Sequence, residues 1–96
     1  MITHIVLFKL KERTTENISL AKAKLLSMDG QVELLRHLEV GTDVLRSERS
    51  YDIALTTRFD SMSDLLAYQV HPYHANDVAA YMRSVSESVA VVDYES

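Results

Sequence analysis

The chain has 96 residues, with 10 lysines and arginines, 14 aspartates and glutamates, and a formal net charge of −4. It is 47% hydrophobic and 25% charged, close to the average of globular proteins, so we expect a packed core of one small domain. The acidic balance lacks the clustered basic face of a nucleic-acid-binding domain. Because there is no cysteine, disulfides, thiolate metal sites and cysteine nucleophiles are excluded.

The chain shows no membrane or targeting signal. No apolar run approaches the roughly 18 residues of a membrane-spanning helix, and the first residues lack the pattern of a signal peptide. No repeat, low-complexity tract or linker divides the sequence, so we expect one domain over residues 1–96. These features predict a cytoplasmic protein that binds neither membrane nor nucleic acid.

The first half of the chain predicts a strand, a helix and a second strand. Residues 4–10 carry apolar side chains in both alternating sets, as in a strand covered on both faces. Thr14 or Thr15 offers an N-cap for a helix whose apolar residues recur at helical spacing until Gly30. Residues 31–35 stay unassigned, and residues 36–43 alternate as a half-exposed edge strand.

The second half predicts a strand, two helical pieces and a last strand. Residues 51–59 read as the third strand, and Ser61 begins a Ser-x-x-Asp helix start. Pro72 is expected to open the second long helix, because proline lacks an N–H and fits best at the first helical position. The apolar face of that helix would be formed by Val78, Tyr81, Met82, Val85 and Val89. The β-branched run at residues 89–94 ends the chain as the fourth strand.

This order of elements predicts an α+β, ferredoxin-like βαββαβ fold, with four antiparallel strands and both helices on one face of the sheet. With Val6 and Phe8 under the helices, Ile5, Leu7 and Ala54 point away from them. An apolar face without a helix needs a cover, and a second copy of the chain would supply it. We therefore expect a homodimer that closes a barrel of two sheets through the helix-free face.

Histidines mark the start of the second long helix. His71 and His74 lie three residues apart, with Pro72 between them. Unpaired backbone N–H groups in a first helical turn disfavour imidazolium, so His74 would be neutral there. A neutral imidazole beside a pocket serves as a general base or a hydrogen-bond partner. The alternative is that His71 caps the helix and His74 packs on the sheet.

Tyr68 and His4 extend this candidate site. Tyr68 precedes His74 by six residues, and a phenol near an imidazole donates to a carbonyl oxygen, so this pair is the best acid/base constellation in the chain. The alternative is a core tyrosine with its hydroxyl at the rim. His4 heads the first strand on the side of Val6 and Phe8, and it approaches His74 if that side faces the helices.

Metal and cofactor sites are not expected. The candidates for a metal site are His4, His71 and His74. Pro72 interrupts the helix between His71 and His74, however, and no aspartate or glutamate lies at a sequence spacing that would make it a further metal ligand. No nucleotide loop or Ser/His/Asp set is present. Asp93 and Glu95 are charged strand residues that pair either across strands or across the dimer.

Four segments of the chain carry a family likeness: His4-Ile5-Val6-Leu7-Phe8-Lys9, Tyr51-Asp52-Ile53-Ala54-Leu55 ending in Phe59, Tyr68-x-x-His71-Pro72-x-His74, and Val92-Asp93-Tyr94-Glu95. With these segments, in this order and over nearly the whole chain, the sequence resembles the stress-responsive A/B-barrel family of dimeric α/β-barrel proteins. The Tyr-x-x-His-Pro-x-His segment is the most specific of them. The resemblance implies a ferredoxin-like fold that forms a barrel dimer.

The resemblance also carries functional expectations. Family members range from stress-induced proteins without an assigned reaction to a plant polyketide cyclase that performs an intramolecular aldol condensation. By this likeness Tyr68 and His74 would be the catalytic pair and His4 a supporting histidine. Ile53 stands where the cyclase has another pocket histidine, and Leu26 where it has a pocket tyrosine, so the implied pocket is more apolar.

Two functional hypotheses result. In the first, a small apolar pocket rimmed by Tyr68, His74 and His4 binds a carbonyl or polyketide-like compound without a cofactor. His74 then abstracts a proton next to the carbonyl, Tyr68 stabilises the oxyanion, and His4 orients one of them. In the second, the protein is a non-catalytic, stress-responsive oligomer whose histidines cap and pack. A cavity between helices and sheet favours the first hypothesis, and a filled core favours the second.

Overall fold

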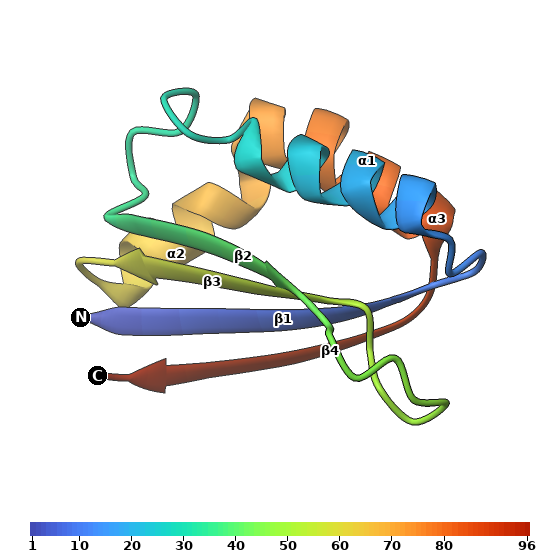
Figure 1. The fold of residues 1–96 in the computed structure, drawn as a ribbon. Helices are drawn as coiled ribbons and strands as arrows, with labels where there is room; N and C mark the ends of the chain where they lie inside the picture. The colour runs from blue at the N-terminus through green and yellow to red at the C-terminus, as the bar shows by residue number, and fades with distance from the viewer.

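The computed structural model describes all residues from Met1 to Ser96 and places a layer of helices on one face of a four-stranded antiparallel sheet (Figure 1). The elements are, in chain order, β1 (Ile2–Leu10), α1 (Thr15–Leu26), β2 (His37–Thr42), β3 (Ile53–Phe59), α2 (Met62–Val70), the π-helix η1 (Tyr73–Ala79), α3 (Ala80–Val85) and β4 (Ser86–Glu95). The strands lie in the order β2-β3-β1-β4. This arrangement confirms the predicted ferredoxin-like fold. No helix is both long and apolar enough to cross a membrane.

Helices α1 and α2 begin where the sequence predicts. The side chain of Thr14 accepts a hydrogen bond from the N–H of Asn17, and that of Ser61 accepts one from the N–H of Asp64. Each cap satisfies one of the first N–H groups, which have no partner inside the helix. After α1 the chain turns at Gly30, whose φ of 80° is a left-handed conformation that glycine adopts without steric cost.

The segment after Pro72 differs in part from the predicted helix. Pro72 opens it as expected, but η1 comes first and the short α3 follows. Val78 and Met82 are buried as predicted. The prediction for Val89 is wrong, because α3 ends at Val85 and Val89 lies in β4, where it is 47% exposed. The predicted spacing holds from Val78 to Met82 across the π-helical turn, and it stops at Val85 because the chain enters β4 there.

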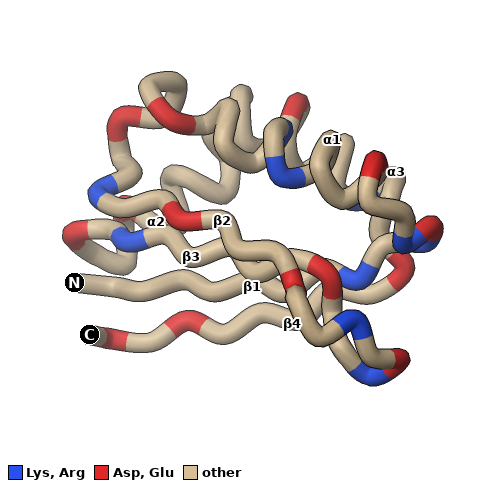
Figure 2. Tube along the Cα trace, viewed as in Figure 1, with Lys and Arg blue, Asp and Glu red and all other residues tan.

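The core lies between the sheet and the helices. Because side chains alternate along a strand, one set from β1 and β3 is buried under the helices: Val6, Phe8, Leu10, Ile53, Leu55 and Phe59. Ile5, Leu7 and Ala54 belong to the opposite set and are half-buried on the face that has no helix. Figure 2 shows charged residues of both signs mainly in the loops and on the helices, while most of β1 and β3 is uncharged.

Asp52 holds the loop between β2 and β3 against the end of β1. Its carboxylate is fully buried and accepts hydrogen bonds from the N–H of Leu10 (2.8 Å), Nε of Arg13 (3.0 Å) and Nη1 of Arg46 (2.9 Å). Burial raises the pKa of Asp52, but these three donors outweigh burial and hold the pKa below its usual value. The loop is therefore tied to the sheet by a charged, hydrogen-bonded cluster.

The same loop lies over one end of the helix-free face. The hydroxyl of Tyr51 is hydrogen-bonded to that of Ser88 in β4 (2.8 Å), and Nζ of Lys9 donates to the carbonyl oxygen of Glu48 (2.9 Å). Figure 1 shows the loop projecting beyond the strands at that end. The rest of the face has no cover from the chain's own helices.

Candidate functional site

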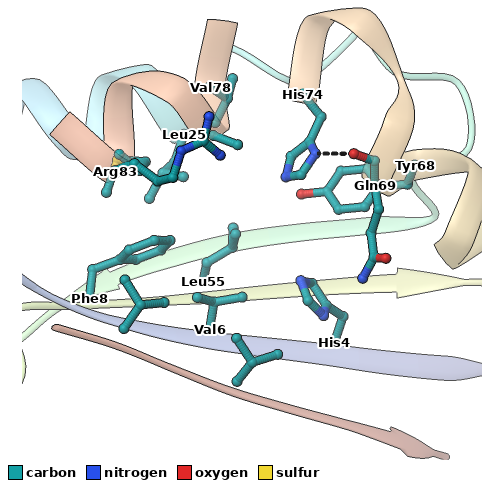
Figure 3. A pocket seen from close by; sticks show the side chains of 14 residues that line it. His4, Val6, Phe8, Leu25, Leu55, Tyr68, Gln69, His74, Val78 and Arg83 are labelled. Atoms are coloured by element: carbon teal, nitrogen blue, oxygen red, sulfur yellow. Dashed lines mark hydrogen bonds between the residues drawn. The ribbon is translucent and has the colours of Figure 1, made fainter. Parts of the chain in front are cut away.

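A cavity of about 300 Å³ lies between the sheet and the segment formed by α2, η1 and α3 (Figure 3). Its walls are mostly apolar, and its polar side chains belong to His4, Tyr68, Gln69, His74 and Arg83. The volume is at the lower end of the range of roughly 300 to 1,000 Å³ that is typical of small-molecule sites. The space suits a small, mostly apolar molecule with a few polar groups.

Tyr68 forms the centre of the polar end of the cavity. It lies on the buried face of α2, and its ring packs against Phe59 (centroid distance 4.8 Å) and against His74 (4.1 Å, with 34° between the ring planes). The hydroxyl donates to Sδ of Met28 at 3.6 Å. A thioether sulfur is a weak acceptor, so a ligand carbonyl oxygen would be a stronger partner for this hydroxyl.

Burial determines the protonation state of Tyr68. The side chain is fully buried, and desolvation raises its pKa above the usual value of 10.0. The phenol therefore keeps its proton at neutral pH and acts as a hydrogen-bond donor.

His74 is a half-buried histidine at the start of η1. Burial lowers its pKa from the usual 6.5, and repulsion from His4, His71 and Arg83 lowers it further, although the carbonyl of Gln69 acts in the opposite direction. Nδ1 lies 3.4 Å from that carbonyl oxygen, which only accepts, so Nδ1 carries the hydrogen. The ring is neutral near pH 7, and its other nitrogen is a free acceptor on the side of the cavity (Figure 3).

His4 reaches the same cavity from β1. It is buried and meets Tyr68 edge-on, with ring centroids 6.0 Å apart. Its Nδ1 is hydrogen-bonded to the carboxylate of Asp93, which lies directly opposite on β4. Because a carboxylate only accepts, Nδ1 donates the hydrogen of this bond, and Nε2 is the other ring nitrogen. His4 therefore has a fixed ring orientation.

The structure separates the two histidines beside Pro72. His71 does not line the cavity. Its Nδ1 accepts a hydrogen bond from the N–H of Tyr73 (3.2 Å), so His71 caps the helical segment, which was the alternative to a role in the site. His74 lines the cavity together with His4 and Tyr68. No group of three or more metal-ligating side chains is found in the structure.

Sequence reasoning missed three features of the site. Asp93 pairs across strands, as one of the two expectations had it, but its partner His4 was not foreseen because the pairing depends on the register between β1 and β4. The two pocket positions inferred from the resemblance are also wrong. Leu26 is 40% exposed and Ile53 lies in the core, and neither lines the cavity; the walls use their neighbours Leu25 and Leu55. The sequence does contain a signal for Leu25, because the helical spacing of the apolar residues in α1 places Leu25 on the buried face of that helix.

The whole chain matches one protein family. The family model described as the Stress Responsive A/B Barrel Domain covers residues 2–96. The chain belongs to the stress-responsive A/B-barrel family. It is 31% identical, over 98 residues and 99% of both chains, to an uncharacterised protein of Streptomyces coelicolor.

Solved structures of similar proteins agree with the A/B-barrel fold. A dimeric protein of unknown function from Bacteroides fragilis, with a ferredoxin-like fold, superposes with a TM-score of 0.82 and 30% identity, covering 99% of this chain and 95% of that one. Hydroxynitrile lyase from Passiflora edulis superposes with a TM-score of 0.81 and 20% identity, covering 97% of this chain and 90% of that one. At that identity the likeness to the lyase shows the fold alone.

Proposed function

We propose that this A/B-barrel protein binds a small, mostly apolar molecule with a carbonyl or phenol oxygen and carries out acid/base chemistry on it without a cofactor. The observation that supports this proposal is the convergence of a phenol donor, Tyr68, an imidazole acceptor, His74, and a second imidazole, His4, on one apolar cavity. The non-catalytic alternative expects a filled core between helices and sheet. The cavity favours the first hypothesis over the second.

In the proposed reaction His74 accepts a proton from the carbon next to a carbonyl group. The C–H bond breaks, the proton moves to Nε2, and the electron pair is delocalised onto the carbonyl oxygen. The hydroxyl of Tyr68 leaves Met28 and donates to this oxygen as its negative charge develops. His4, held by Asp93, packs edge-on against Tyr68 and orients its ring. The apolar walls strengthen these interactions by keeping water out. Polyketide-like carbonyl compounds belong to the proposed substrate class.

Exchange of carbon-bound protons for deuterium tests this proposal without knowledge of the natural substrate. We expect the protein to accelerate exchange of the methyl protons of acetophenone in D₂O, followed by ¹H NMR. His74→Ala and Tyr68→Phe should each reduce the acceleration by about a hundredfold, the lower end for acid/base catalysis. Tyr73→Phe is the matched control, because Tyr73 does not line the cavity. Unchanged ligand affinity and exchange in both His74→Ala and Tyr68→Phe would overturn the proposal.

We also propose that the chain forms a homodimer through the helix-free face of the sheet. Ile5, Leu7 and Ala54 lie on this face without a helix over them, and β4 adds Val92 and Tyr94, which are 52% and 47% exposed. The Bacteroides fragilis relative is described as dimeric. Light scattering at micromolar concentration should give twice the mass of the chain, and a monomeric mass would refute the dimer.

A further inference from the structure

Arg83 is an exposed residue and the only lysine or arginine that lines the cavity, and the proposed chemistry leaves it without a role. It extends from α3 on the side of the cavity near Phe8, away from the end that holds Tyr68 and His74 (Figure 3). Its guanidinium takes part in none of the ion pairs of the chain, whereas Arg13 pairs with a buried aspartate. A cation that faces an apolar cavity without a partner is an open binding group.

No carboxylate lines the cavity to balance this charge. The carboxylate of Asp93 is hydrogen-bonded to His4. Tyr68 is a protonated phenol and His74 a neutral imidazole near pH 7, as described above. The lining of the cavity therefore carries the positive charge of Arg83 on the α3 side and no negative charge.

We infer that the ligand of this cavity is a small carboxylate, whose apolar body lies between sheet and helices and whose carboxylate group pairs with Arg83. A guanidinium presents parallel N–H donors that match the two oxygens of a carboxylate. With the acid group held by α3, the other end of the ligand lies beside Tyr68 and His74. This inference rests on the proposed function for the location of the site and adds the chemical class of the ligand.

Two probes of nearly equal shape test the inference: phenylacetate, which is anionic, and phenylacetamide, which is neutral. Their dissociation constants are measured by calorimetry near neutral pH, at an ionic strength of about 0.15 M. We expect the protein to bind phenylacetate about tenfold more tightly than phenylacetamide, the preference that one charge-assisted hydrogen bond confers. Arg83→Gln should remove the preference and leave the affinity for phenylacetamide unchanged. Arg58→Gln is the matched control, because Arg58 is exposed, unpaired and outside the cavity, and it should keep the preference.

Each outcome decides between the two claims. The assignment of a carboxylate to Arg83 is wrong if the unaltered protein binds both probes equally, or if the preference for phenylacetate survives Arg83→Gln. Either result still agrees with a ligand-binding cavity. If neither probe binds while thermal melting shows a folded protein, the cavity proposal fails together with the inference. Loss of the preference in Arg83→Gln and not in Arg58→Gln supports both.

Discussion

His4 and Asp93 face each other across β1 and β4, and their side chains are hydrogen-bonded. The pair joins the first strand to the last at the floor of the cavity. The His4 side chain is 7% exposed and that of Asp93 is 30% exposed, so the carboxylate lies at the edge and the imidazole inside. The last strand therefore supports, through Asp93, the three proposed site residues His4, Tyr68 and His74, which come from β1, α2 and η1.

The tautomer of His4 should depend on Asp93. In the unaltered protein we expect ¹⁵N NMR of the imidazole to show hydrogen on Nδ1, because the carboxylate only accepts. Asp93→Ala removes this acceptor and should lower the occupancy of hydrogen on Nδ1. Glu95→Ala, on the same side of β4, should leave the spectrum unchanged. A His4 ring without hydrogen on Nδ1 in the unaltered protein contradicts this assignment.

His74 should make the stability of the fold more sensitive to acid. Its pKa is lowered in the folded state, so below pH 6.5 the unfolded chain binds more protons than the folded one. The free energy of unfolding therefore falls as pH drops through this value towards the lower folded pKa. Urea denaturation between pH 7.5 and roughly 5 should show a smaller loss for His74→Gln than for the unaltered protein. Parallel curves for the two proteins would count against a lowered pKa.

Asp52 should contribute far more to stability than an exposed aspartate. Asp52→Asn removes a buried charge that is hydrogen-bonded to Arg13 and Arg46, and we expect a loss of about 2 to 4 kcal/mol in the free energy of unfolding. Asp60→Asn is the matched control, since the Arg36–Asp60 pair is about half exposed on both sides and should be worth about 1 kcal/mol or less. Equal losses for the two variants would show that the Asp52 cluster does not stabilise the loop.

The helix-free face should carry the dimer interface. Val92→Asp places a charge on this face and should raise the dimer dissociation constant by at least about tenfold, because a buried, unpaired charge is costly. Val70→Asp is the control, since Val70 is 75% exposed on α2 and lies in the helix layer. Analytical ultracentrifugation distinguishes the two, and equal effects would argue against this face as the interface.

Much of the fold could be predicted because its signals are local. The alternation of β1 places Val6 and Phe8 on one face and Ile5 on the other from the sequence alone, and the structure shows that the first set lies under the helices. The caps at Thr14 and Ser61 are read from neighbouring residues. Such features do not depend on how distant segments pack.

The site was harder to predict because its geometry is set by distant contacts. The pairing of His4 with Asp93 follows from the register between the first and last strands, which no local pattern specifies. The π-helical turn after Pro72 and the early end of α3 at Val85 carry no local signal in the sequence. The sequence named Tyr68 and His74 as partners, but the size and walls of the cavity depend on the packing of the whole helix layer.

The central claim, a ligand cavity between sheet and helices, is tested most directly by NMR of isoleucine, leucine and valine methyl groups during titration with acetophenone. We predict saturable shifts at the cavity residues Val6, Leu55 and Val78, with no shift at Val44, which is 92% exposed in the loop between β2 and β3. A titration without shifts in the cavity, or with shifts confined to surface residues such as Val92, would contradict the account.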